Sequence, residues 1–153
     1  MSAVIAGFAR SPFTRAMKGE LSKKRPDDIA SEVINALIRN NNINPELIED
    51  LIVGTAFPEA EQGYNIARLL IFLTDLPETV PGVTINRFCG SSMQAIHDAA
   101  GRISLGAGNA FIAGGIESMS RIPMTGFNPM PNPKLIDLYP STFTSMGITA
   151  ENL

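Results

Sequence analysis

The chain has 153 residues, of which 44% are hydrophobic and 18% charged, and its net charge at pH 7 is -3. These values are typical of a globular protein with a packed core. The acidic balance and the scattered lysines and arginines, with one short cluster at Lys23 to Arg25, argue against a nucleic-acid partner. A single cysteine excludes an internal disulfide and fits a reducing compartment.

Two further features restrict the class of protein. Neither paired cysteines nor His-rich spacing offers a metal site, so we expect no metal. No basic leader precedes the first apolar run, and no later run approaches the ~20 apolar residues of a membrane span. We therefore expect a soluble, cytoplasmic protein with no membrane span.

The first third of the chain predicts strand, helix and strand. The apolar run Ala3 to Phe8 is typical of a strand, and Pro26 with two acids predicts a helix start and a helix to about Asn40. A capped turn is predicted at Asn44-Pro45, and Leu51 to Val53 predict a strand buried on both faces. The inner face of the helix is expected at Ile29, Val33, Ala36 and Leu37.

The middle of the chain continues this alternation. Asn65 predicts the cap of a helix that runs to about Leu76, with apolar residues on nearly every side. A strand is expected from Val83 to Arg87, a helix after Cys89, and a strand from Ala110 to Ala113 that Gly114-Gly115 ends. The order βαβαβαβ predicts a parallel sheet with helices on its faces.

Beyond Ser118 the pattern changes. Five of the eleven prolines lie between Pro123 and Pro140, and no sustained period is present there. We expect an irregular excursion, followed by a helix start near Thr149.

Cys89 lies where the third predicted strand gives way to a helix. Unpaired N–H groups and the positive dipole end at a helix N-terminus favour a thiolate, which is the reactive form of cysteine. The small residues Gly90, Ser91 and Ser92 leave room for a ligand, and backbone N–H groups there can bind a developing oxyanion. From these residues alone, a buried and inert cysteine remains an equal alternative.

The rest of this helix predicts how it is held. Met93, Ile96, Ala100 and Ile103 recur at helical spacing, so we expect them to pack on the sheet. Asp98 and Arg102 are expected to pair on the opposite face. Ser91 and Ser92 are expected to cap the helix, since no GxSxG arrangement surrounds them.

Four segments together resemble one enzyme family. INRFCGSSMQAIHDAAGRI at Ile85 to Ile103 is similar to the acyl-enzyme signature of thiolases. ARSPF at Ala9 to Phe13, AGGIESMSRIP at Ala113 to Pro123 and MGITAEN at Met146 to Asn152 resemble the same family in the same order. Within it, CGSSMQAIHDAA is most similar to the bacterial 3-ketoacyl-CoA thiolases of fatty acid β-oxidation.

The resemblance implies a fold and a division of the chain. It implies an α/β protein, the N-terminal half of a thiolase-like layered αβαβα fold with a mainly parallel sheet, with the C-terminal half absent from this chain. Residues 1–118 would form the N-terminal core half and residues 119–153 the start of the loop domain.

The chemistry that the resemblance implies is acyl transfer between thioesters. Cys89 would attack the keto carbon of a 3-ketoacyl-CoA, acetyl-CoA would leave, and CoA, a substrate and not a cofactor, would take the acyl group. In thiolases a histidine and a second cysteine from the C-terminal half complete the site, and this chain contains neither. His97 does not match that histidine, because it lies eight residues beyond Cys89, ~12 Å along a helix axis.

The resemblance also assigns roles to other residues. Met146 would bind substrate, while Met119, Met124 and Met130 either line an acyl or pantetheine tunnel or pack ordinarily. Ser145 stands where acetoacetyl-type thiolases tend to have histidine, which argues against that subtype. Asn86, Arg87 and Glu117 are expected to be structural. A homodimer is implied, and a β-oxidation multifunctional subunit is a further implied partner.

Three alternatives remain open at this point. An acetyl-CoA C-acetyltransferase would share the whole mechanism. A non-catalytic thiolase-like lipid carrier would keep the fold, although the intact Cys89 motif argues against it. A decarboxylating ketoacyl synthase shares a cysteine at a helix start, but its usual motif differs from NRFCGSS.

Overall fold

A computed structural model describes residues 2–153. Its strands are β1 (Asp50–Gly54), β2 (Gly82–Ile85) and β3 (Phe111–Gly115). Its α-helices are α1 (Pro26–Asn40), α2 (Ile66–Ile71), α3 (Ser91–Leu105), α4 (Pro133–Leu138) and α5 (Met146–Glu151). Short 3-10 helices are also present, among them Pro45–Leu47, which Asn44 caps as predicted by accepting from Glu46 N.

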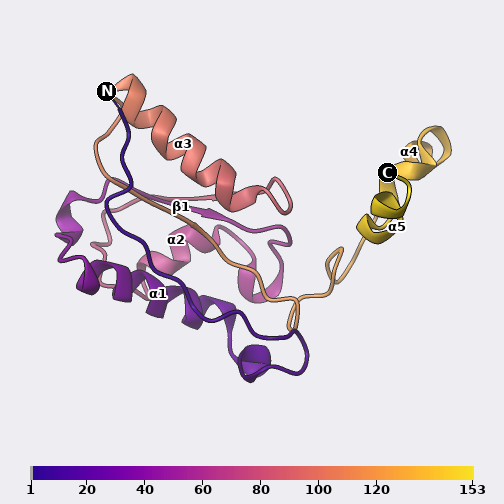
Figure 1. The fold of residues 1–153 in the computed structure, drawn as a ribbon, viewed down its shortest axis with the longest axis horizontal. Helices are drawn as coiled ribbons and strands as arrows, with labels where there is room; N and C mark the ends of the chain where they lie inside the picture. The colour runs from indigo at the N-terminus through magenta and orange to yellow at the C-terminus, as the bar shows by residue number, and fades with distance from the viewer. Residues whose placement is uncertain (1) are drawn as a thin grey trace.

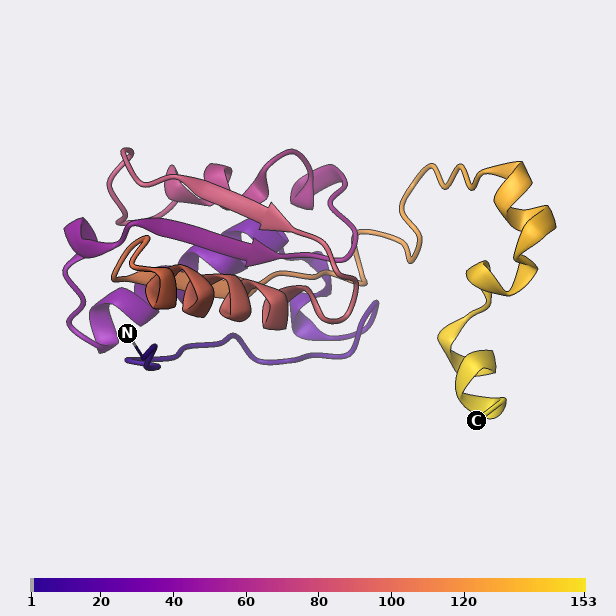
Figure 2. The ribbon, with the colours of Figure 1, turned by 90° about the horizontal axis from the view of Figure 1, so that it is seen from above.

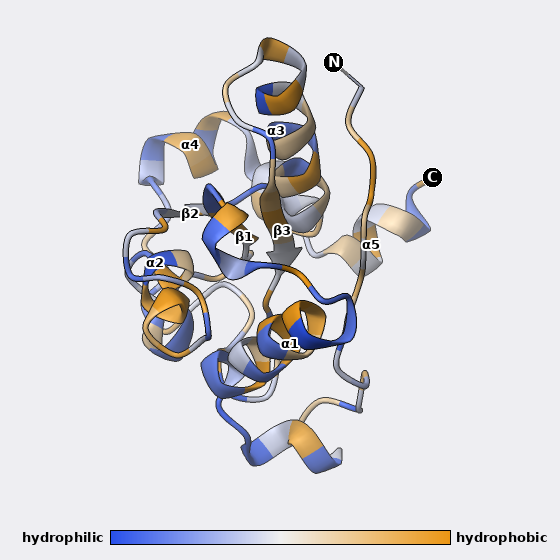
Figure 3. Ribbon diagram, turned by 90° about the vertical axis from the view of Figure 1, so that its left-hand side faces the viewer, coloured by the Kyte–Doolittle hydropathy of each residue, from blue (hydrophilic) through white to orange (hydrophobic). Residues whose placement is uncertain are grey.

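The three strands form one parallel sheet in the order β2-β1-β3. Figure 3 shows α3 on one side of this sheet and α1 with α2 on the other. The arrangement confirms the predicted α/β class, because each parallel pair is joined by a crossover that contains a helix. All three strands point the same way, so their carboxyl ends meet at one edge, toward which the arrowheads in Figure 2 point.

The core divides along the pleat of β1. Leu51 and Val53 face the α1 and α2 side, where they pack with Ile34, Leu70 and other apolar residues. Ile52 points to the opposite face and packs with Ala95 and Ala99 of α3. Alternate side chains of a strand point to opposite faces, so a strand covered on both sides is apolar at every position, as predicted for Leu51 to Val53.

Helix α1 begins and ends where the sequence predicts. Pro26 occupies its first turn, which needs no N–H donor, and Asp27 and Asp28 complement the positive end of the dipole. The predicted inner face is only partly right. Ile34 and Ile38 are the buried apolar residues, while Ile29, Val33, Ala36 and Leu37 are half-buried.

The predicted strand at Ala3 to Phe8 is wrong. This segment forms no ladder with the sheet, and Val4, Ile5 and Phe8 are 82–87% exposed. Figure 1 shows the indigo N-terminal segment crossing over the sheet toward α1. β-propensity identifies an apolar run, but a strand also needs a partner edge, which composition does not reveal.

Two middle elements are shorter than predicted. α2 ends at Ile71 and not near Leu76, because 3-10-type hydrogen bonds from Phe72 N to Leu69 O and from Leu73 N to Leu70 O close the last turn. β2 ends at Ile85 and leaves Asn86 and Arg87 in the turn before α3. The buried residues of α2 are Ile66, Ala67, Leu70 and Ile71.

Helix α3 packs on the sheet through a different face from the one predicted. Ala95 is fully buried, whereas Met93 is 60% exposed and Ile96 is 48% exposed. The face of α3 that packs on the sheet carries the small residues Ala95 and Ala99, because small side chains allow the helix axis to lie close to the sheet. The predicted Asp98–Arg102 pair is also wrong, because Arg102 pairs with Asp50 of β1 and Asp98 accepts from Gln94 Nε2 at 2.6 Å.

The segment from residue 119 onward is more helical than predicted. α4 and α5 occupy part of the expected irregular excursion, and α5 begins at Met146 and not near Thr149, because the Ser145 hydroxyl caps Ile148 N. In Figures 1 and 2 the α4–α5 segment stands apart from the sheet and its helices. The division at residues 118 and 119 remains a prediction.

Candidate active site

Cys89 lies in a short turn at the carboxyl end of β2. The strand ends at Ile85, Gly90 is the N-cap residue and α3 begins at Ser91. The thiol is free and its residue is exposed. The structure contradicts the alternative of a buried cysteine, whereas the reactivity of the thiol stays a prediction.

Two side chains fix the conformation of this turn. Asn86 donates from Nδ2 to Ala56 O at 2.9 Å and accepts from Phe88 N at 2.8 Å. The buried Ser91 hydroxyl donates to Phe88 O at 2.6 Å and accepts from Arg87 N at 2.8 Å. Phe88 has a φ of 46°, a left-handed conformation that costs energy for a bulky residue. Ser91 therefore braces the turn and does not cap the helix, since the N-cap is Gly90.

The turn consumes some of the N–H groups that a helix start offers. Gly90 N donates to Arg87 O and Ser91 N donates to Phe88 O, each at 3.0 Å. Among residues 2–153, the N–H groups of Cys89, Ser92 and Met93 have no protein acceptor. These three groups, and not the whole first turn, are the ones that could bind an oxyanion near the sulfur.

Two glycines outside the motif allow α3 to start where it does. A Cβ atom on Gly54 would come within 2.5 Å of Ser92 N, and one on Gly115 within 2.7 Å of Ser92 Cβ. The first turn of α3 therefore docks directly on the carboxyl ends of β1 and β3. The predicted strand end at Gly114-Gly115 is too early, because β3 continues through Gly115. The sequence gives no sign of the role of Gly54, because only the fold brings it under residue 92.

Glu117 anchors the end of β3, as expected. Its Oε2 accepts from Ala56 N and its Oε1 accepts from Gln62 Nε2, both at 2.6 Å. The sequence gives no sign of Gln62, which is fully buried and accepts from Ser118 N at 2.6 Å. The burial of its amide at the end of the 3-10 helix Ala60–Gln62 marks Gln62 as structurally important, and this burial is visible only in the fold.

The other candidate residues are not brought to Cys89. His97 is exposed on α3, a continuous helix, so it lies about two turns beyond the junction. Met146 is 72% exposed on α5, in the segment that stands apart in Figure 2. The methionines Met119, Met124 and Met130 are also exposed. Met119 lines the cavity on the α1 side of the sheet, whereas Met124 and Met130 are not among its lining residues.

A cluster of four charges joins three parts of the chain. Arg121 pairs through two nitrogens with Glu61, and Arg25 pairs with Asp27 at 2.6 Å and with Glu61 at 3.3 Å. The hydrogen bonds from Arg121, helped by the charge of Arg25, hold the pKa of Glu61 below its usual value of 4.5. The cluster fastens the exit of β3 to the start of α1.

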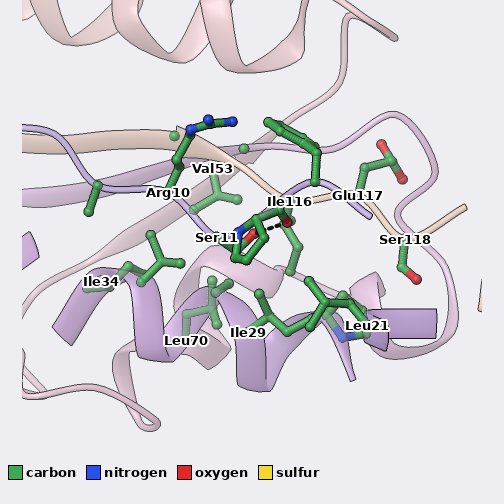
Figure 4. A pocket seen from close by; sticks show the side chains of 18 of the residues that line it. Arg10, Ser11, Leu21, Ile29, Ile34, Val53, Leu70, Ile116, Glu117 and Ser118 are labelled. Atoms are coloured by element: carbon green, nitrogen blue, oxygen red, sulfur yellow. Dashed lines mark hydrogen bonds between the residues drawn. The ribbon is translucent and has the colours of Figure 1, made fainter. Parts of the chain in front are cut away.

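A cavity of about 450 Å³ lies on the α1 side of the sheet, under the N-terminal segment. Figure 4 shows Ile29 and Ile34 of α1 and Val53 of β1 around it, with Arg10, Ser11 and Glu117 also on its wall. Cys89 is not among its lining residues.

No helix that the structure describes has the length and apolar character needed to cross a bilayer.

The comparisons with known proteins agree on one family. Residues 3–153 match the model of the thiolase N-terminal domain. The chain is 46% identical over 151 residues to a 3-ketoacyl-CoA thiolase of Bacillus subtilis, covering 99% of this chain and 39% of that protein. It is 41% identical over 151 residues to a 3-ketoacyl-CoA thiolase of Pseudoalteromonas translucida and to one of Saccharophagus degradans, covering 98% of this chain and 39% and 38% of those proteins.

The chain therefore spans about two fifths of the length of these relatives. The match to the family model runs from residue 3 to the last residue, so it includes the turn that carries Cys89, the exit of β3 and the α4–α5 segment. The resemblance read from the four motifs is confirmed: the chain belongs to the thiolase family, as its N-terminal domain.

Proposed function

We propose that the protein containing this chain transfers acyl groups between thioesters through an acyl group on Cys89. The reaction is the thiolytic cleavage of a 3-ketoacyl-CoA by CoA, which gives acetyl-CoA and an acyl-CoA shortened by two carbons. The observation that carries the proposal is the exposed, lone thiol on a braced turn at the start of α3. The relatives named 3-ketoacyl-CoA thiolase support this choice of substrate.

The chemistry proceeds in two balanced steps. The Cys89 thiolate attacks the C3 carbonyl, the C2–C3 bond breaks, and its electron pair goes to C2 of the departing acetyl-CoA, which takes up a proton. The CoA thiolate then attacks the acyl–cysteine carbonyl and releases the Cys89 thiolate. Covalent catalysis replaces one difficult step by two easier ones.

This chain supplies the nucleophile and part of the oxyanion site. The unpartnered N–H groups near the sulfur can stabilise the oxygen that becomes negative in each step. The proton acceptor for the thiol and the acid for the acetyl carbanion are assigned to residues outside this chain, because His97 points to solvent two turns away. The isolated chain is therefore expected to be inactive.

Several finer properties belong to the same proposal. CoA acts as a substrate, and no resident cofactor or metal is needed for either step. Met146 is assigned to the acyl or pantetheine side of the substrate. A homodimer, an association with a β-oxidation multifunctional subunit and a cytoplasmic location are part of the same proposal, on the strength of the family resemblance and the composition.

Steady-state thiolysis tests the proposal. Purified protein containing this chain should consume a 3-ketoacyl-CoA in the presence of CoA, and Cys89→Ser should lower kcat/KM by at least about 10³-fold. The matched control is His97→Asn on α3, the helix that follows Cys89, and it should retain the activity. Unchanged turnover by Cys89→Ser would overturn the proposal, and an equal loss in His97→Asn would overturn the assigned roles.

A further inference from the structure

We propose that Glu117 is a positioning residue for Cys89, which it reaches through the backbone of Ala56 and the side chain of Asn86. The inference rests on the proposed function, because it concerns the geometry of the same thiol. It adds a residue that lies 28 positions from the cysteine in the sequence and just beyond the end of β3. Nothing in the local motif around Cys89 indicates this connection.

The first link holds the loop after β1. Glu117 Oε2 accepts from Ala56 N at 2.6 Å, and Glu117 Oε1 accepts from Gln62 Nε2 at 2.6 Å. Gln62 also donates to Thr55 Oγ1 and to Phe57 O, each at 3.1 Å. Because Thr55 and Gln62 are almost completely buried, this part of the loop has little freedom to move.

The second link carries that position to the cysteine turn. The same residue that gives its N–H to Glu117 gives its carbonyl to Asn86, since Asn86 Nδ2 donates to Ala56 O at 2.9 Å. Asn86 Oδ1 in turn accepts from Phe88 N at 2.8 Å, one residue before the cysteine. Phe57 and Phe88 also contact each other, with ring centroids 6.4 Å apart.

The conformation of Phe88 connects these hydrogen bonds to the position of the Cys89 thiol. Its φ of 46° turns the chain so that Cys89 leaves the line of β2, and such a conformation persists only where neighbouring groups hold it. Asn86 and Ser91 are the side chains that hold it. A displacement of Ala56 therefore moves Asn86, and Asn86 moves the residue that aims the thiol.

Glu117 must be a carboxylate for this role. Both of its oxygens accept from N–H donors, so it presents acceptors only. Glutamine has the same shape but one acceptor oxygen, and its amide nitrogen would face either Ala56 N–H or Gln62 N–H. Gln62 is not free to turn its amide, because its oxygen accepts from Ser118 N.

The test compares two matched substitutions in the protein containing this chain. Glu117→Gln breaks the proposed relay. Glu49→Gln makes the same substitution just before β1, at the opposite end of the sheet. There a single oxygen accepts from Asn109 N at 3.1 Å and from Asn109 Nδ2 at 3.2 Å, and a glutamine oxygen can still accept both. We expect Glu117→Gln to lower kcat by about 10- to 100-fold with little change in KM, because a misplaced nucleophile loses orientation and not binding. Glu49→Gln should leave both kinetic constants unchanged.

A double-mutant cycle separates positioning from general destabilisation. In an Asn86→Ala background the relay is already cut, so adding Glu117→Gln should lower kcat by less than about twofold further. Unchanged kcat in Glu117→Gln, an equal loss in Glu49→Gln, or full additivity with Asn86→Ala would overturn the inference. If Glu117→Gln does not fold, the Asn86→Ala variant still tests the inference, because an unchanged kcat in that variant would by itself overturn it. Thiolysis by wild type that survives Cys89→Ser would contradict the proposed function instead.

Discussion

The turn that carries Cys89 and the segment beyond residue 119 differ in how the chain supports them. At the turn, Asn86 and Ser91 make hydrogen bonds within the domain, and Gly54 allows the start of α3 to pack closely on the sheet. Beyond residue 119, Met130 and Met146 face solvent and α4 and α5 stand apart from the sheet. The turn of the proposed nucleophile is therefore fixed by this domain, whereas the proposed substrate-binding segment stands apart from the sheet and its helices (Figure 1).

The largest effect is expected where α3 meets β1. Gly54→Ala places a methyl group against the backbone of Ser91 and Ser92, so we expect the free energy of unfolding to fall by about 3 kcal/mol. Gly114→Ala is the matched control, because a Cβ atom there meets nothing within 4 Å, and its change should stay within about 0.5 kcal/mol. Urea unfolding of both variants measures the difference, and equal midpoints would disprove the close docking of α3.

A smaller loss is expected at the other end of α3. Arg102→Ala leaves the buried carboxylate of Asp50 without its cation, and Asp50 Oδ1 already has no hydrogen-bond partner in the described residues. We expect a loss of about 1–2 kcal/mol in the free energy of unfolding. Asp98→Ala, which removes the pair first expected from the sequence, should change it by less than about 0.5 kcal/mol. If denaturant unfolding instead showed a larger loss for Asp98→Ala than for Arg102→Ala, the Arg102–Asp50 pair would be contradicted.

The charge cluster predicts a dependence on pH. Arg121 and Arg25 lower the pKa of Glu61 in the folded state below the unfolded value of 4.5. A depressed carboxyl pKa stabilises the fold fully above about pH 4.5, and this contribution is lost as the pH falls through the folded pKa. Glu61→Gln should therefore unfold more easily than wild type near neutral pH, and the difference should shrink in acid. Parallel stability curves from urea unfolding at each pH would contradict the cluster.

The smallest structural effect is expected in the exposed segment. Met146→Ala removes a side chain that is 72% exposed, so stability should change by less than about 0.5 kcal/mol. If Met146 binds substrate as proposed, KM for the 3-ketoacyl-CoA should rise severalfold. Met130→Ala on the same segment serves as control and should leave KM unchanged. Equal KM values for both variants and wild type would show that Met146 does not bind the substrate.

Local signals predicted much of the domain. Proline and acids marked the start of α1, asparagine side chains marked the caps before Pro45 and Ile66, and glycine and serine after Cys89 marked the start of α3. Each of these signals acts within one turn of its own residue. The same local pattern left the burial of Cys89 open, and the structure shows that the residue is exposed.

Long-range pairing was not predictable in this way. Nothing near residues 3–8 shows that they miss the sheet, and nothing in α3 shows that its alanines, and not its methionine and isoleucines, face β1. Glu117 and Gln62 are hydrogen-bonded although they are 55 positions apart in the sequence, so their contact depends on the finished fold. The role of Cys89 as nucleophile and that of Met146 in binding stay predictions.

The central claim is that acyl groups attach to the Cys89 sulfur. Protein containing this chain can be mixed with an acyl-CoA, quenched in acid, digested and analysed by peptide mass spectrometry. We predict that the Cys89 peptide gains the mass of the acyl group and loses it again on adding CoA. An unmodified Cys89 peptide in enzyme that is turning over substrate would show that Cys89 does not carry the acyl group.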